Sequence, residues 1–134
     1  MKKLQKSLMK KGFIFTFILC MVAPISAFAA TGTYNSYYDF TGGVFSKYLS
    51  MNSKKNITVS TYPDLNKTST GANKINIELR KKGLLGDSIV DSSSNAARKS
   101  DSCTLTTTSA DDYRVYYYGV PNGYRYYGDT TIKY

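Results

Sequence analysis

Apolar side chains recur at every second position along much of this chain, which is the spacing of a β-strand rather than of a helix. In the clearest case, Ile75, Ile77 and Leu79 alternate with polar residues across positions 74–80. Successive side chains of a strand point to opposite sides, so such a segment has one buried and one solvated face. The pattern therefore predicts a strand in which Ile77 is buried and Glu78 faces solvent.

The same alternation recurs in shorter segments that are rich in threonine and tyrosine, two residue types that favour strands. These segments cover residues 57–60, 103–105, 113–118 and 131–134. Glycine-containing or polar breaks separate them, and the longest break, residues 91–102, is predicted to be a polar loop. About seven to eight short strands at this spacing predict an all-β fold, either a small antiparallel β-sandwich or a small barrel.

The C-terminal region is predicted to form a tyrosine-rich hairpin. Two tyrosine-rich runs flank Pro121-Asn122-Gly123, and Asn-Gly between alternating runs is a strong turn signal. The inward face of the first run is set by Tyr113, Val115 and Tyr117. The residues left for an outward, ligand-binding face are Tyr116, Tyr118, Arg125 and Tyr127.

Two interpretations of these tyrosines are open. Exposed tyrosines beside arginines form flat apolar surfaces with polar rims, which suit stacking on sugar rings or contact with another protein. Alternatively, the tyrosines fill the core of a chain that has 13 tyrosines but no tryptophan. The run Asp112-Tyr113-Arg114-Val115 also suits a tyrosine corner, in which a tyrosine hydroxyl bonds to the backbone a few residues upstream.

The first 29 residues have the three-part pattern of a secretory signal peptide. Five lysines precede an apolar run at residues 13–23, and Ala27-Phe28-Ala29 follows as a cleavage site. The apolar run is shorter than the roughly 20 residues that span a bilayer. We therefore expect cleavage after Ala29, leaving residues 30–134 as a single all-β domain that is secreted or associated with the cell wall. The alternatives are an uncleaved anchor, a buried helix, or a lipoprotein modified at Cys20.

Composition restricts the chemistry. The chain has no histidine, which excludes histidine-activated nucleophiles and the commonest zinc ligand. Beyond the leader there are 13 basic and nine acidic residues, a net charge of +4, too low a density to predict a nucleic-acid partner. No paired acids suited to glycoside hydrolysis are identifiable. The sequence therefore predicts no enzyme activity and no transmembrane segment after cleavage.

No metal site or cofactor is predicted. Asp39, Asp129 and the pair Asp111-Asp112 offer oxygen ligands, but the spacing of a calcium-binding loop is missing. Cys103 is the one cysteine beyond the leader, so a disulfide within the mature chain is excluded. Cys103 shares a strand face with Leu105, which predicts a small buried apolar side chain; pairing between chains is the alternative. Sparse cysteine and a lysine-rich leader suggest a Gram-positive bacterium.

These observations predict a secreted, non-enzymatic binding module. Its expected partner is a cell-wall polymer, an extracellular polysaccharide or another protein, contacted through the C-terminal hairpin. Lys81 and Lys82, in a basic cluster at a strand end, suit an anionic wall polymer by charge, or simply protect a solvated strand edge. The alternative function is that of a secreted antimicrobial or membrane-active protein, which a positive charge and a tyrosine-rich β surface also suit.

Overall fold

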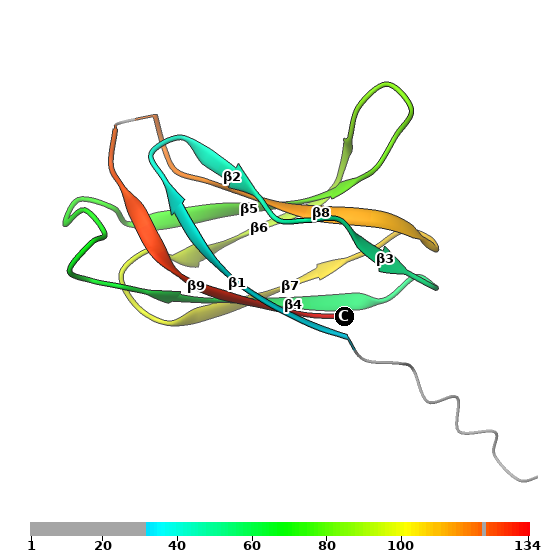
Figure 1. Ribbon diagram of the computed structural model, residues 1–134, viewed down its shortest axis with the longest axis horizontal. Coiled ribbons are helices and arrows are strands. Elements are labelled where there is room, and N and C mark those ends of the chain that lie inside the picture. The colour runs from blue at the N-terminus through cyan, green and yellow to red at the C-terminus, as the bar shows by residue number, and fades with distance from the viewer. Residues whose placement is uncertain (1–31, 122) are drawn as a thin grey trace, which may run out of the picture. The chain divides into compact units, whose positions relative to one another are not determined.

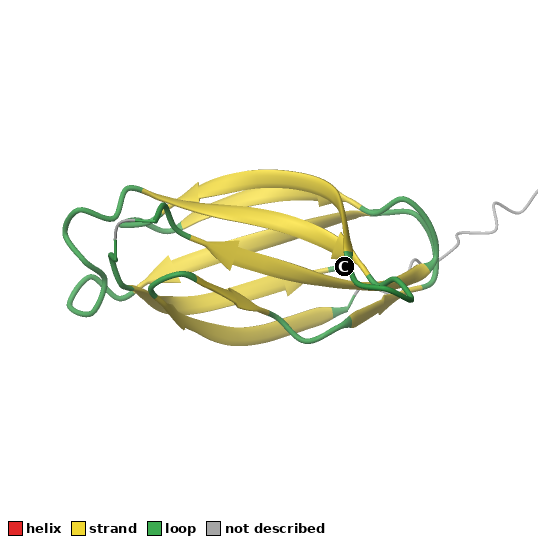
Figure 2. Cartoon of the chain, turned by 90° about the horizontal axis from the view of Figure 1, so that it is seen from above, coloured by secondary structure: helices red, strands yellow, loops and turns green. Residues whose placement is uncertain are grey.

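Two antiparallel β-sheets pack face to face in the computed structural model, which describes residues 32–121 and 123–134 (Figures 1 and 2). The described residues form nine strands and no helix. This confirms the all-β sandwich predicted from the alternation. The predicted signal peptide lies outside the described residues.

The first sheet has four strands in the order β1-β9-β4-β7. Their bounds are β1 Thr33–Phe40, β9 Tyr126–Lys133, β4 Asn56–Pro63 and β7 Asp101–Thr106. The central strand β9 pairs with β1 along its whole length and with β4 on its other side. The C-terminal strand is therefore enclosed between two neighbours, which protects its backbone hydrogen-bonding groups from solvent.

The second sheet has the path β2-β8-β5-β6, and β3 also pairs with β8. The bounds are β2 Gly43–Phe45, β8 Asp111–Tyr118, β5 Lys74–Lys81, β6 Ser88–Ala96 and β3 Leu49–Met51. Strands β2 and β3 pair with successive parts of β8, on the edge opposite to β5. A register shift lies between Leu79 and Arg80 of β5.

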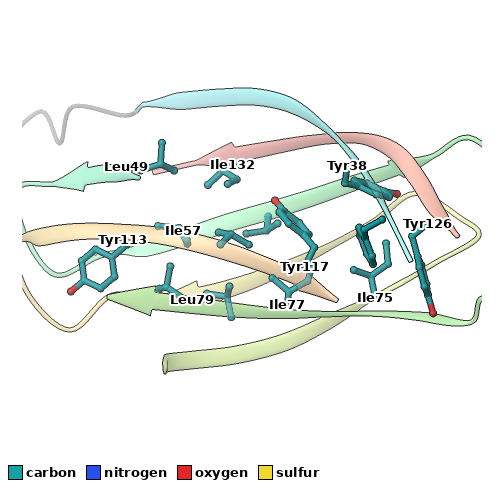
Figure 3. Close-up of a cluster of buried hydrophobic side chains, with 14 of the residues drawn as sticks. Tyr38, Leu49, Ile57, Ile75, Ile77, Leu79, Tyr113, Tyr117, Tyr126 and Ile132 are labelled. Carbon is teal, nitrogen blue, oxygen red and sulfur yellow. The ribbon is translucent and has the colours of Figure 1, made fainter. Parts of the chain in front are cut away.

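The core lies between the sheets and contains the alternating apolar residues that the sequence singled out (Figure 3). Ile75, Ile77 and Leu79 are at most 1% exposed, which confirms the predicted register of β5. Tyrosines supply much of the remaining packing: Tyr38, Tyr113, Tyr117 and Tyr126 are at most 2% exposed. The core-filling interpretation is therefore correct for these four side chains.

Two of these four tyrosines form hydrogen bonds through their hydroxyls, whereas the buried hydroxyls of the other two have no partner among the described residues. Tyr113 forms the expected tyrosine corner, because its hydroxyl donates to the Ser109 carbonyl at 3.0 Å and accepts from the Ser109 amide at 3.0 Å. These two bonds fix the turn that precedes β8 against the first residues of β8. The hydroxyls of Tyr117 and Thr130 are 2.9 Å apart across the core, and burial raises the pKa of Tyr117. The first contact links the turn before β8 to β8 itself, and the second links β8 of one sheet to β9 of the other.

The predicted polar loop at residues 91–102 is wrong. Strand β6 continues to Ala96, and β7 begins at Asp101. The serines of β6 are compatible with a strand because β6 lies at the edge of its sheet. Its backbone pairs with β5, whereas the side chains of Ser92, Ser93 and Ser94 are exposed. The exception is Asn95, which is 1% exposed and donates to Thr61 Oγ1 at 3.1 Å.

The predicted C-terminal hairpin is also wrong, because β8 and β9 lie in different sheets. Strand β8 pairs with β5, β2 and β3, whereas β9 pairs with β1 and β4. The segment between them crosses from one sheet to the other, and the Ser69 amide donates to the Arg125 carbonyl at 2.9 Å. The turn signal at Gly123, whose φ is +74°, therefore marks a crossover rather than a hairpin.

Cys103 is free but only half-buried, against the full burial that the sequence predicted. It packs at the margin of the core in β7, an edge strand of the four-stranded sheet. Burial raises the pKa of its thiol. The edge position explains the difference, because the strand alternation does not reveal which strands have neighbours on both sides.

An Ile77→Asp substitution is expected to unfold the protein. Ile77 is 0% exposed, and an unpaired buried carboxylate costs more than about 4 kcal/mol. The matched control is Asn76→Asp, which introduces the same side chain one position away on the outer face of β5. Thermal melts should show a cooperative transition near wild type for the control only. Equal losses in both variants would contradict the assignment of faces.

Candidate binding surface

Three aromatic rings stack in a row on the outer face of the five-stranded sheet. Phe45 of β2 lies opposite Tyr116 of β8, with ring centroids 4.4 Å apart. Tyr118 follows on the same strand, 5.3 Å from Tyr116. We call Phe45, Tyr116 and Tyr118 the aromatic row. Because neighbouring rings are stacked, their faces are turned mainly toward one another across two strands. Phe45 is 39% exposed, and Tyr116 and Tyr118 are partly exposed.

The row follows from the alternation of β8 and from one glycine. Because Tyr113, Val115 and Tyr117 face the core, Tyr116 and Tyr118 must face outward. Tyr116 then lies over Gly43: a Cβ atom added to Gly43 would be 2.4 Å from the Tyr116 hydroxyl oxygen. The lack of a side chain at Gly43 therefore makes room for the Tyr116 ring above β2.

Two arginines border the aromatic row. The guanidinium of Arg114 lies 3.8 Å from the centroid of Phe45 and 4.8 Å from that of Tyr48. The guanidinium of Arg80 lies 4.7 Å from the centroid of Tyr116. Such cation–π contacts contribute roughly 0.5–2 kcal/mol each. They also hold the two guanidinium groups over the faces of the Tyr116 and Phe45 rings.

Each of these arginines is balanced by an acid. Arg80 donates to Glu78 Oε2 at 2.6 Å and 2.9 Å. Arg114 donates to Asp87 Oδ2, and the hydroxyl of Tyr48 donates to Asp87 Oδ1 at 2.7 Å. Glu78 is on the predicted outer face, but its side chain is only 13% exposed. The surface is therefore apolar with a polar, nearly neutral rim.

The pKa shifts agree with this arrangement. The side chain of Asp87 is 5% exposed; burial opposes its ionisation, but the hydrogen bonds from Tyr48 and Arg114 outweigh burial and lower its pKa. Burial and the neighbouring Glu78 carboxylate raise the pKa of Tyr118. At neutral pH Tyr118 is therefore a neutral ring and the Asp87 carboxyl is ionised.

The structure divides the predicted binding residues into separate groups. Tyr116 and Tyr118 belong to the aromatic row, but Arg125 and Tyr127 lie with the four-stranded sheet. Arg125 donates to both oxygens of Asp39 at 2.8 Å, and Lys67 lies 4.2 Å from the centroid of Tyr127. The predicted face cannot form as one surface, because β8 and β9 are not neighbours.

Lys81 and Lys82 are both paired with acids at the start of β8. The Nζ atom of Lys81 is 3.1 Å from Asp111, and that of Lys82 is 3.7 Å from Asp112. Lys82 adjoins the candidate surface, since its Nζ atom lies 5.2 Å from the centroid of Tyr48. The basic cluster is thus largely neutralised, which weakens the case for binding by charge alone.

The prediction from sequence missed Phe45, Tyr48, Arg80 and Arg114 as members of the surface. Arg114 carried a signal, because it precedes Tyr116 by two residues and Tyr118 by four, which places all three on the same face of one strand. Phe45 carried none, since its place depends on the pairing of β2 with β8. Within residues 32–121 and 123–134, no group of three or more metal-ligating side chains occurs, and no helix is long and apolar enough to cross a membrane.

Comparisons with known proteins leave the family open. No family model matches the chain, and no curated protein matches it. Among solved structures, a crystal structure of PirA is similar with a TM-score of 0.44 and 11% sequence identity, covering 75% of this chain and 93% of that one. A likeness at this level carries no argument about the function of this chain.

Asp87 is expected to contribute stability at neutral pH that is lost in acid. Its pKa is lower in the folded protein than the ordinary value of 3.8, so its contribution is complete above that value and disappears as the pH falls through the folded-state pKa. Asp87→Asn should cost about 1–3 kcal/mol at pH 7, measured by urea unfolding. The cost should shrink as the pH falls below 3.8.

The matched control is Asp129→Asn, at an exposed position of β9. Its free energy of unfolding at pH 7 should differ from that of wild type by no more than about 0.5 kcal/mol. A cost for Asp87→Asn that stays constant down to strong acid would show that its carboxylate charge has no role in holding Arg114.

Proposed function

We propose that this protein is a non-enzymatic module that binds an extracellular or cell-wall polysaccharide, and that the aromatic row is its contact surface. The observation that carries the proposal is the stacking of Phe45, Tyr116 and Tyr118 into one strip beside Arg80 and Arg114. The C–H faces of sugar rings are apolar and pack on aromatic rings, whereas their hydroxyls need hydrogen-bonding partners at the edges.

The arrangement favours a polymer over a small molecule. The row extends over two strands on an outer sheet face, and such a surface contacts successive sugar rings without enclosing any of them. Arg80 and Arg114 supply N–H donors for hydroxyl or acidic groups along the edge. The net charge of +4 beyond the leader adds a mild attraction to anionic wall polymers, in keeping with the secretion expected from residues 1–29.

A Tyr116→Ala, Tyr118→Ala double variant is expected to lose binding to insoluble cell-wall polysaccharide about thirtyfold or more. Loss of a central aromatic anchor costs about 2 kcal/mol. The matched control is Tyr37→Ala, which removes a ring that is 67% exposed on β1 of the other sheet. Binding is measured by depletion from solution at increasing polymer, with thermal melts on all variants.

Phe45→Ala provides a second test if the tyrosine variant loses stability, because Phe45 is at the exposed edge of the row. An Arg125→Ala, Tyr127→Ala variant should bind as wild type, since these residues lie with the other sheet. Unchanged binding in folded Phe45 and tyrosine variants would disprove the surface. Attachment that depends on Lys81 and Lys82 and fades with salt, or capture of a protein instead of polysaccharide, would disprove the ligand class.

A further inference from the structure

The connection between β5 and β6 exposes two adjacent leucines completely. Leu84 and Leu85 are 104% and 105% exposed, and Gly83 and Gly86 flank them. The loop stands away from the outer face of the five-stranded sheet in Figure 1. Single exposed apolar residues are ordinary on protein surfaces. Two neighbouring leucines at the tip of a projecting loop form a small apolar patch that is exposed to water.

The shape of this loop does not depend on the leucines. Gly86 has a φ of +131°, and a Cβ atom at Gly83 would be 2.4 Å from the Gly86 carbonyl oxygen, so both glycines are needed to close the turn. The base is held by Asp87, which accepts from Tyr48 and Arg114. Because the core does not use the leucine side chains, stability gives no reason for their apolar character.

Side chains at the base of the loop are graded in polarity. Ile89 is 56% exposed just beyond the loop, and Tyr48, with a ring and a hydroxyl, is 37% exposed. The Lys82 side chain is 55% exposed, and its Nζ atom lies 3.7 Å from Asp112 and 5.2 Å from the Tyr48 centroid. An apolar tip above an amphipathic ring and a cation matches the order of hydrocarbon, interface and headgroup in a bilayer.

A bilayer suits this tip better than a protein partner does. Specific protein interfaces bury about 1,200–2,000 Å² over broad complementary surfaces, whereas a projecting two-leucine tip offers a small convex contact. A bilayer surrounds an inserted side chain without needing a complementary shape. The net charge of +4 beyond the leader also complements anionic lipid headgroups.

We propose that Leu84 and Leu85 insert into the surface of a lipid bilayer that contains anionic headgroups, while Lys82 remains at the headgroup level. This membrane contact uses the loop and not the aromatic row, so it is independent of polysaccharide binding. Insertion is confined to the boundary of the bilayer, because the apolar patch contains only two side chains.

The absence of tryptophan from the chain permits a direct test. Leu85→Trp places the only tryptophan at the tip, where it can be excited selectively over the tyrosines. Leu65→Trp, at a leucine that is 51% exposed between β4 and β5, serves as its control. Vesicles of phosphatidylcholine and phosphatidylglycerol at three to one are titrated into each variant. The emission of the Leu85→Trp variant should shift to shorter wavelength and become shielded from an aqueous quencher, whereas that of the control should not change.

A second test removes the apolar tip. In co-sedimentation with the same vesicles, a Leu84→Ser, Leu85→Ser variant should lose at least tenfold in partitioning, with an unchanged melting temperature. Leu65→Ser and the Tyr116→Ala, Tyr118→Ala variant should partition as wild type, which separates this proposal from polysaccharide binding. Failure of the wild-type protein to bind vesicles would overturn the proposal.

The proposal is also overturned if the double serine variant still binds, or if binding depends on Lys82 but not on the leucines. Analytical ultracentrifugation tests the alternative that the loop contacts a second copy of this chain. A dimer of the wild-type protein that the serine substitutions dissociate would show that the loop contacts a second copy instead.

Discussion

The inward packing of β8 is the constraint on which the rest of the structure depends. Tyr113, Val115 and Tyr117 are each at most 2% exposed between the sheets, and β8 pairs with β5 on one side and with β2 and β3 on the other. Since side chains alternate along a strand, burying this row forces Arg114, Tyr116 and Tyr118 outward. The core and the candidate surface are therefore two consequences of one strand register.

The tyrosines on the two faces of β8 have different roles. Inside, the hydroxyl of Tyr117 meets Thr130 and that of Tyr113 meets Ser109, so buried polar atoms gain partners while the rings fill volume. Outside, Tyr116 and Tyr118 stack on one another and are partly exposed. An aromatic ring with one polar atom serves both environments, which explains how a chain without tryptophan builds both a core and a stacking surface.

Charge pairing connects the two proposed contact regions. Arg114 packs on Phe45 of the aromatic row and also donates to Asp87 at the base of the leucine loop. The Tyr48 ring contacts Arg114, and its hydroxyl donates to Asp87. One cluster therefore orders the edge of the aromatic row and the foot of the loop. The charges in it nearly cancel, so apolar contacts, rather than net charge, are expected to dominate binding at either region.

The sequence by itself determined which side chains face inward. Alternation in β5 and β8 assigned Ile77, Val115 and Tyr117 to the core and Tyr116 to the outer face, because the period of two is a local property of an extended backbone. The tyrosine corner at Tyr113 was also evident, since its partner Ser109 is only four residues upstream. These features need no knowledge of strand order.

Only the tertiary structure decided which strands are neighbours. Pairing uses backbone groups that are nearly identical in every strand, so sequence pattern does not distinguish β5 from β9 as the partner of β8. That choice placed Phe45 beside Tyr116 and separated Arg125 and Tyr127 from them. It also made β6 an edge strand, whose serines resemble a loop in sequence although its backbone is fully extended. The aromatic row depends on these long-range pairings, and for that reason the sequence placed only Tyr116 and Tyr118 of it on one face.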